Sequence, residues 1–331
     1  MIRRLVLAVL LLFALPAHAD PGAARAYLAT VQASPELQAF LDRTIAALLA
    51  TDAALKRSEL RVALLDLSRP GPPRLAQHHG AVPIYPASVI KFVYLMAAYA
   101  WQERETLRID AALDQSLTHS IRESSNRATQ EVFWRLTDTE PGPDLPPDAY
   151  AAFRQRRLRV DAWLRELGID GLHCVNPTYD GGPDLFGRDV QFLKDRSVAG
   201  GLPSRGDEYP NRNAMTANGT VALLALLATD RALTPADSAT VRQRMRRDPR
   251  EQPHLAARIA GGAARTPGLQ VYAKSGTWGP IYADAGIVRD ASGRQFALAV
   301  FTQGRPPYRG DFIAELTHQS VRELLLGSAL P

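Results

Sequence analysis

The clearest chemical signal in this chain is a serine followed three residues later by a lysine. The sequence has 39 lysines and arginines together, and only four of these are lysines. One of them, Lys91, closes the run Ser88-Val89-Ile90-Lys91. Arginine stays protonated, whereas a partly buried lysine amine can lose its proton and act as a base. The pair therefore predicts nucleophilic catalysis by the Ser88 hydroxyl, with Lys91 removing its proton.

The local sequence favours a helix that would bring these two side chains together. Pro86 precedes an apolar stretch that runs from about Ser88 to Glu103, and residues three apart on a helix are neighbours. Negative charge that develops near a helix N-terminus is stabilised by the helix dipole. Ser-x-x-Lys alone is weak, because chance produces it in roughly one chain in five of such composition.

A second motif, Ser124-Ser125-Asn126, lies in an expected turn between helices. A hydroxyl at Ser124 is suited to relay a proton to a leaving nitrogen, and Asn126 to bind a substrate amide. Serine and asparagine are also preferred at helix starts, so an ordinary N-cap explains the motif equally well.

A third motif, Lys274-Ser275-Gly276-Thr277, lies on an expected strand near the C-terminus. Lys274 would supply fixed positive charge, and the Ser275 hydroxyl would bind a carboxylate. A glycine in a strand often marks a place where a ligand approaches the backbone, which we expect at Gly276. The backbone N–H of Thr277, with that of Ser88, would form an oxyanion hole.

The elements that must position these motifs follow an α+β order. Helical periodicity begins after Ser34. The expected strands are 60–67, 74–77, 271–273, 286–289 and 296–302, and a helix covers 312–325. We predict an antiparallel sheet flanked by helices, made from residues 34–85 and 255–331. An all-helical lobe would cover 86–254, with a long loop at about 176–213 and the active site in the cleft between the lobes.

The first nineteen residues are typical of a cleaved secretion signal. Arg3 and Arg4 precede an eleven-residue apolar run, followed by Ala17-His18-Ala19. We therefore expect a secreted or periplasmic protein without a membrane anchor, and we expect a monomer. Removal of the two arginines takes the net charge from +5 to +3, which gives no reason to expect nucleic acid. The single cysteine, Cys174, excludes an intrachain disulfide.

Taken together and in this order, the three motifs resemble those of the penicillin-recognising serine enzymes, which are β-lactamases and D,D-peptidases. The run from Tyr85 into the apolar helix resembles the nucleophile helix of class A β-lactamases. Residues 274–304 resemble their two C-terminal strands, and 215–227 the helix after their omega loop. The resemblance implies that Ser88 is acylated, that Lys91 is the base, and that Ser124 shuttles a proton. It also implies a small β-lactam or peptidoglycan stem-peptide substrate, with no metal and no cofactor.

The chain departs from the class A pattern in the loop that should activate water. No glutamate occurs between Glu166 and Glu208. Asp180 and Asp184 lie nearer the expected place, but in this glycine-containing stretch the favoured interpretation is that both are plain turn residues. A carboxylate-binding arginine is also missing after the third motif, and Arg309 is the suggested substitute.

Three functions therefore remain open. The first is a β-lactamase that hydrolyses the β-lactam amide through an acyl-enzyme. The second is a D,D-carboxypeptidase or transpeptidase that binds penicillin and releases it slowly. The third is a non-catalytic envelope-binding protein, which the retention of Ser88, Lys91 and Lys274 argues against.

Overall fold

The computed structural model describes residues 19–179, 185–204 and 207–327 of the 331-residue chain. The proposed signal segment therefore lies almost entirely outside the described residues. In the part of the chain that the structure describes, no helix is long and apolar enough to cross a membrane.

The centre of the fold is a six-stranded sheet with the order β1-β3-β2-β10-β9-β8. Neighbouring strands are antiparallel, except that β1 runs parallel to β3. The strands are β1 (Gln32–Ala33), β2 (Glu59–Asp66), β3 (Arg74–His78), β8 (Gln270–Trp278), β9 (Ile281–Arg289) and β10 (Gln295–Gln303). Both ends of the chain contribute to this sheet, which confirms the predicted α+β architecture, and β8 forms one edge.

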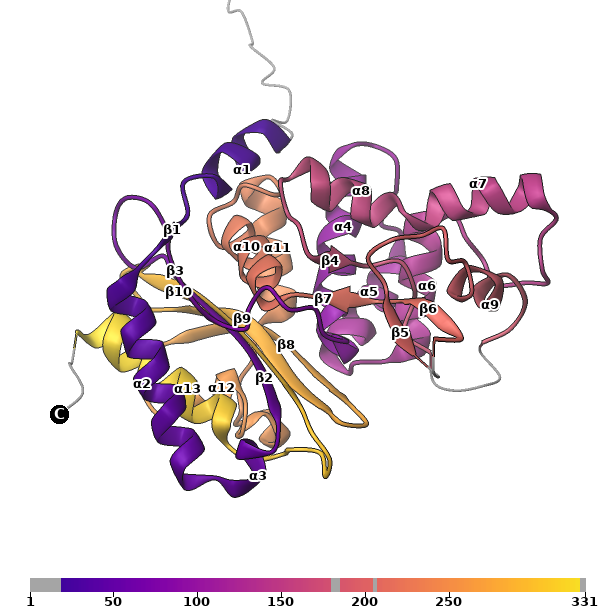
Figure 1. The fold of residues 1–331 in the computed structure, drawn as a ribbon. Coiled ribbons are helices and arrows are strands. Elements are labelled where there is room, and N and C mark those ends of the chain that lie inside the picture. The colour runs from indigo at the N-terminus through magenta and orange to yellow at the C-terminus, as the bar shows by residue number, and fades with distance from the viewer. Residues whose placement is uncertain (1–18, 180–184, 205–206, 328–331) are drawn as a thin grey trace, which may run out of the picture.

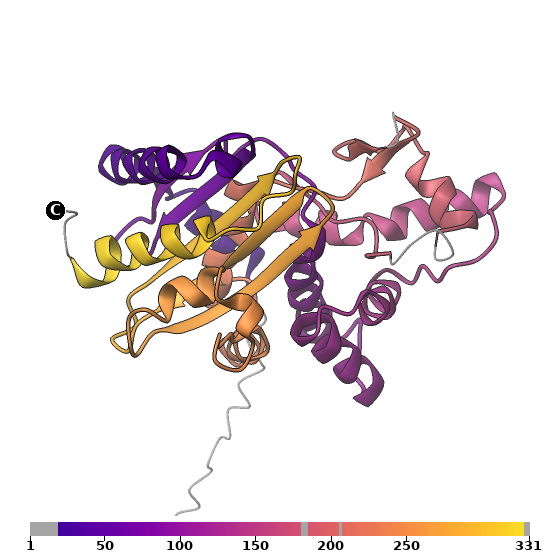
Figure 2. The same cartoon turned by 90° about the horizontal axis from the view of Figure 1, so that it is seen from below.

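Helices cover both faces of the sheet (Figures 1 and 2). One face packs against α2 (Pro35–Thr51), α12 (Ile259–Ala263) and α13 (Phe312–Val321) through a cluster of buried apolar residues. The predicted N-cap is present, because the Ser34 hydroxyl accepts a hydrogen bond from the backbone N–H of Leu37. The opposite face packs against α10 (Ala217–Ala228), whose residues are apolar on nearly every side.

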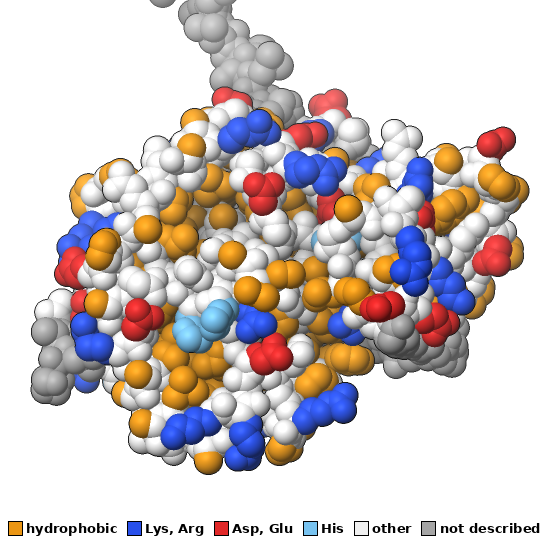
Figure 3. Space-filling model, viewed as in Figure 1, with side chains coloured by type: hydrophobic (Ala, Val, Ile, Leu, Met, Phe, Trp, Pro, Cys, Tyr) orange, Lys and Arg blue, Asp and Glu red, His pale blue; other side chains and the backbone are white. Residues whose placement is uncertain are grey.

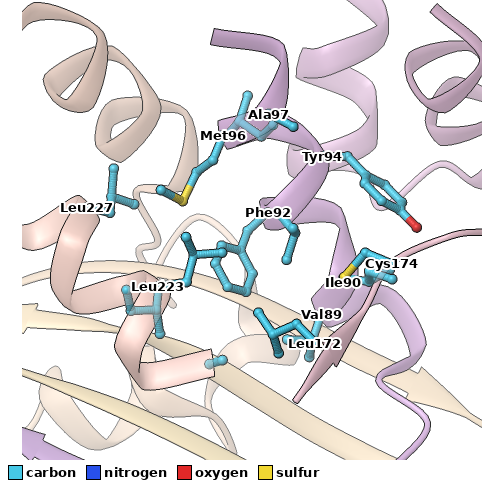
Figure 4. Close-up of a cluster of buried hydrophobic side chains, with 14 of the residues drawn as sticks. Val89, Ile90, Phe92, Tyr94, Met96, Ala97, Leu172, Cys174, Leu223 and Leu227 are labelled. Carbon is cyan, nitrogen blue, oxygen red and sulfur yellow. The ribbon is translucent and has the colours of Figure 1, made fainter. Parts of the chain in front are cut away.

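A further group of helices forms a lobe beside the β8 edge (Figure 1). They are α4 (Lys91–Glu103), α5 (Ala111–Arg122), α6 (Asn126–Thr137), α7 (Pro147–Arg157) and α8 (Arg159–Glu166). Every residue of α4 from Lys91 to Trp101 is buried, so this helix is surrounded on all sides rather than along one stripe. Its side chains interlock with Leu223 and Leu227 of α10 and with the strand that carries Leu172 (Figure 4).

The structure adds elements that the sequence did not reveal. Helix α1 (Pro21–Leu28), capped by Asp20, precedes the first predicted helix. The segment 176–213, which we expected to lack periodic structure, contains α9 (Gly187–Leu193), β5 (Leu202–Ser204) and β6 (Tyr209–Arg212). These elements span three to seven residues, which is too short for hydrophobic periodicity to identify.

Candidate active site

The nucleophile candidate lies on a tight turn rather than inside a regular helix. Residues Ala87–Ile90 form a single 3-10 turn, η1, that leads directly into α4. Ala87 has a φ of 48°, which is unusual for a residue with a Cβ atom. Such conformations occur where the surrounding structure holds a functional residue in place. The turn leaves Ser88 half-buried, whereas Lys91 is fully buried.

Lys91 connects the first motif with the second. Its Nζ donates hydrogen bonds to the backbone carbonyl of Ser124 and to Oδ1 of Asn126, both at 2.6 Å. Ser124 itself has a φ of 59°, and this left-handed conformation lets its carbonyl and its hydroxyl serve two partners. Ser125 supplies the N-cap of α6. The N-cap interpretation therefore applies to Ser125, while Ser124 and Asn126 contact Lys91.

Lys274 connects the second motif with the third. Its Nζ lies 2.9 Å from Oγ of Ser124 and donates to the backbone carbonyl of Ser275 at 2.7 Å. The side chain is buried, and this burial, together with the positive charges of Lys91 and Arg247, lowers the pKa of Lys274 well below its ordinary value. The fixed positive charge expected at Lys274 is thus opposed by its surroundings. An amine in this position can also exchange a proton with the Ser124 hydroxyl.

Gly276 connects the third motif with the first. A Cβ atom built on Gly276 would lie 2.8 Å from the backbone oxygen of Pro86 and 3.0 Å from the backbone nitrogen of Val89. The absence of a side chain therefore lets the nucleophile turn pack directly on β8. We expected Gly276 to admit the backbone of a ligand, but in this structure its close neighbour is the chain's own turn.

The backbone of Thr277 faces the open edge of the sheet. In an antiparallel strand the N–H and C=O of one residue point to the same side. The carbonyls of Val271 and Ala273 accept hydrogen bonds from Arg247, and that of Ser275 from Lys274, so these alternate residues face away from β9. Thr277 continues the same alternation, so its N–H also points away from β9.

The structure places an arginine at the third motif that the sequence analysis missed. Arg258 is buried, donates to Oγ1 of Thr277 at 2.7 Å, and stacks 3.5 Å from the ring centroid of Tyr282. Arg309, the residue we suggested, instead donates to the backbone carbonyls of Gly279 and Tyr308. No signal in the sequence pointed to Arg258, because a bent segment between α11 (Pro235–Met245) and α12 brings it to β8.

The carboxylates that we considered for water activation are distributed differently. Glu166 pairs with Arg104 at 2.9 Å and Glu208 with Lys194 at 3.4 Å, and each glutamate side chain is about half exposed. Asp180 and Asp184 lie outside the described residues. In the described ranges, no group of three or more His, Cys, Asp and Glu side chains is placed to hold a metal ion.

Comparison with known proteins identifies the family. A model of the Beta-lactamase enzyme family matches residues 157–324, about half of the chain. No curated protein sequence matches.

Solved structures match over most of the chain at low identity. A β-lactamase from Desulfarculus baarsii is 19% identical, covering 88% of this chain and 99% of its own, with a TM-score of 0.59. The TLA-1 extended-spectrum β-lactamase is 17% identical, covering 87% and 99%, with a TM-score of 0.61. PBP-A is 15% identical, covering 89% and 98%, with a TM-score of 0.59. These likenesses establish the fold, and the family match establishes that the chain belongs to the Beta-lactamase enzyme family.

Proposed function

We propose that this protein is a serine hydrolase that is acylated at Ser88 by β-lactams and hydrolyses the β-lactam amide. The observation that carries the proposal is that each of the three motifs is in contact with the other two. Two buried lysines approach Ser124, one at its carbonyl and one at its hydroxyl, and the turn that holds Ser88 packs on Gly276. Three separate segments therefore supply a nucleophile, amines and hydrogen-bond donors to one place.

In the proposed acylation step, the Ser88 oxygen attacks the carbonyl carbon of the lactam amide while the Lys91 amine takes its proton. The backbone N–H groups of Ser88 and Thr277 stabilise the oxyanion. The carbon–nitrogen bond then breaks, Ser124 passes its hydroxyl proton to the leaving nitrogen, and Ser124 regains the proton that Lys91 took from Ser88. Hydrolysis of the resulting ester by water releases the acid and restores the Ser88 hydroxyl.

The substrate carboxylate is assigned to the polar end of β8. Lys274, Ser275 and Arg258 lie along this strand, and Arg258 keeps its charge at all ordinary pH values. Asn126 would hold the acyl-side amide, since its Oδ1 is already oriented by Lys91.

A second candidate function is a D,D-peptidase that forms the same acyl-enzyme and releases it slowly. The observation in its favour is that Glu166 and Glu208 are both engaged in half-exposed ion pairs with basic residues. We therefore assign the activation of the deacylating water to neither glutamate. For the β-lactamase, that step is assigned to Asp180 or Asp184.

An intact-mass time course with benzylpenicillin separates these functions. A β-lactamase is expected to show a transient adduct and continuing turnover of the chromogenic substrate nitrocefin. A peptidase is expected to show one stable adduct per protein and the release of D-alanine from an acyl-D-alanyl-D-alanine peptide.

Ser88→Ala is the control for both outcomes, because it should abolish the adduct without unfolding the protein. If the wild-type protein forms no adduct with either substrate class, the hydrolase proposal fails and the non-catalytic envelope-binding function remains. Detection of the protein in a periplasmic extract, with a mass that lacks residues 1–19, would test the proposed export.

A further inference from the structure

A cavity of about 520 Å³ opens directly beside the nucleophile turn. Tyr85, three residues before Ser88, forms one wall, and Trp278, which follows Thr277 on β8, forms another. Tyr179, Tyr209, Arg212 and Arg305 are also among its lining residues. The cavity thus joins the site already described to the segment 176–213.

The position of the cavity relative to β8 indicates which part of a substrate would enter it. Ser275 comes before Thr277 on the strand, and Trp278 comes after it. A substrate with its carbonyl at the Thr277 N–H and its leaving-side carboxylate near Ser275 extends its acyl side toward Trp278. The cavity is therefore placed to receive the acyl side chain.

Arg212 places a positively charged guanidinium in this cavity, beside two aromatic rings. Its guanidinium lies 4.3 Å from the ring centroid of Tyr85 and 5.8 Å from that of Trp278. These two rings also contact each other edge to face, with centroids 5.3 Å apart. Aromatic rings that cover the face of a guanidinium leave its N–H edge available for in-plane hydrogen bonds.

The neighbouring strand residue fixes Arg212 in place. Asn211 is fully buried, receives a contact from Nε2 of His173 at 2.8 Å and donates to the carbonyl of Phe192 at 3.2 Å. Successive side chains of a strand point to opposite sides, so the buried Asn211 directs Arg212 away from the interior and into the cavity. The position of the cation is thus built into β6.

Among the residues that the structure describes, no carboxylate forms an ion pair with Arg212. Its Nε is buried and has no hydrogen-bond partner among the described residues. Burial lowers the pKa of Arg212, opposed in part by Tyr85, yet an arginine remains charged at neutral pH. The described residues that line the cavity include two arginines and no aspartate or glutamate. A partly desolvated cation that has no ion-pair partner among the described residues is a favourable place for an anionic group of a ligand.

We propose that this cavity is an acyl-side subsite for a carboxylate-bearing side chain, in which Arg212 binds the carboxylate between Tyr85 and Trp278. The inference rests on the proposed function and adds the substrate class to it. The preferred substrate is an amide or lactam with one carboxylate on each side of the bond that is cleaved. One carboxylate is held at the polar end of β8, and the other is held by Arg212.

The test compares β-lactams that differ at one position. Carbenicillin is benzylpenicillin with an added carboxylate on the acyl side chain, and ampicillin carries an ammonium group at the same position. We expect the second-order acylation rate, followed by intact mass, to be highest for carbenicillin and lowest for ampicillin. In Arg212→Gln, the ratio of the carbenicillin rate to the benzylpenicillin rate should fall about tenfold, because a charge-assisted hydrogen bond is lost.

Two further variants control for general effects. Arg231, whose guanidinium stacks on Tyr27 at 4.4 Å, carries the same kind of stacked charge. Arg231→Gln should leave the carbenicillin-to-benzylpenicillin ratio unchanged. Arg212→Lys keeps the charge without the planar fork, so its ratio should fall between those of the wild type and Arg212→Gln. Thermal unfolding of each variant reports whether it is folded.

A peptide pair distinguishes a stem-peptide substrate from a β-lactam. Acetyl-aminoadipyl-D-alanyl-D-alanine carries an acyl-side carboxylate, and its norleucyl analogue has a neutral side chain of similar length. Faster release of D-alanine from the aminoadipyl peptide, lost in Arg212→Gln, assigns the subsite to peptide substrates. A preference confined to carbenicillin assigns it to β-lactams.

An unchanged rate ratio in folded Arg212→Gln for both substrate pairs would overturn the subsite while leaving acylation at Ser88 intact. If the wild-type protein forms no adduct at all, the proposed function fails. The subsite is then tested separately, by measuring the binding of an anionic ligand and a neutral ligand. The binding of phenylmalonate monoamide, which carries a carboxylate, and of phenylacetamide, which does not, is measured by ligand-observed NMR. Binding of the anionic amide by the wild type, with loss in Arg212→Gln, supports the subsite, and equal binding of the two amides refutes it.

Discussion

At the scale of single residues, the candidate site depends on two lysines that the chain buries almost completely. Lys91 is 0% exposed and Lys274 is 1% exposed, and both approach Ser124. Two amines so close together disfavour each other's charge, which is one cause of the lowered pKa of Lys274. Arginine could not replace either amine in proton transfer, since its guanidinium does not lose its proton.

Replacement of Lys91 by arginine tests this reasoning. We expect Lys91→Arg to keep the positive charge but to reduce the acylation rate by about 10²- to 10⁴-fold, the usual contribution of a general base. Lys194→Arg is the matched control, because Lys194 is half exposed and pairs with Glu208 on the surface. Stopped-flow acylation with a fluorescent penicillin measures both variants. A Lys91→Arg variant that acylates at the wild-type rate would contradict the assignment of the base.

At the scale of elements, the site exists because secondary structures approach one another unusually closely. The η1 turn lies against β8 at the one position of the strand motif that has no side chain. Buried hydrogen bonds connect strand β6 to the helical lobe. The ring of His173 in β4 (Leu172–His173) contacts the carboxylate of Asp161 in α8 through one nitrogen and the side-chain amide of Asn211 in β6 through the other. The distance between elements, rather than the type of element, determines whether the motifs meet.

Gly276→Ala tests the contact between η1 and β8. The added methyl would press on the backbone of Pro86 and Val89, so we expect a loss of about 1–3 kcal/mol in the free energy of unfolding. The displaced turn should also slow acylation of Ser88. Gln270→Ala, at the exposed start of the same strand, should change neither property. Urea denaturation and acylation kinetics report the two effects, and a fully active, fully stable Gly276→Ala variant would exclude a tight contact.

His173 should make the stability of the segment 176–213 depend on pH. Its ring nitrogens lie 2.7 Å from the carboxylate of Asp161 and 2.8 Å from Oδ1 of Asn211, so both face acceptors. Burial opposes the charged ring, but its hydrogen bonds and the charge of Asp161 outweigh this, and the pKa of His173 is raised. This stabilisation is complete below the ordinary histidine pKa and is lost as pH rises through the raised pKa of the folded protein.

We therefore expect His173→Gln to lower the free energy of unfolding by about 1–3 kcal/mol in mildly acidic solution, because a buried charged hydrogen-bond pair is lost. The difference from the wild type should narrow as the pH increases. His254→Gln alters an exposed histidine and serves as the control. Thermal unfolding across a pH series provides the measurement, and a difference that is constant with pH would show that folding does not raise the pKa of His173.

At the scale of the whole molecule, the two lobes share one apolar core. A single cluster of buried residues continues from β2 and β10 of the sheet through α10 to α4 and α5 of the helical lobe. Arg247 adds a polar connection, since its guanidinium donates to the carbonyl of Ile121 at 2.5 Å and to that of Ala273 at 3.1 Å. Basic and acidic side chains are mixed over the face seen in Figure 3, in keeping with the small net charge.

A shared core couples the unfolding of the two lobes. We expect one cooperative transition in differential scanning calorimetry, because neither lobe can unfold without exposing the apolar surface of the other. The transition should move to higher temperature when a β-lactam acylates Ser88, because the attached acyl group makes its non-covalent contacts with the site only in the folded protein. Two resolved transitions would mean that the lobes are independently stable.

The sequence by itself determined the fold class, the principal strands and helices, and three short motifs that carry reactive side chains. Each of these depends on a short pattern along the chain: the continuous apolar run of β10, the proline and serine that start α2, and serine three residues before lysine. These signals come from residues that are close together along the chain, so the sequence alone is enough to detect them.

Only the tertiary structure decided which distant residues meet. Arg258 and Arg212 lie at the candidate site because the chain folds back on β8, and the short elements between residues 176 and 213 hold Arg212 in its cavity. The same folding buries Lys274 beside Lys91 and lowers the pKa of Lys274. The residues next to Lys274 in the sequence do not predict this shift. Burial and the field of other charges depend on distance in space, and the separation of residues along the chain does not record that distance.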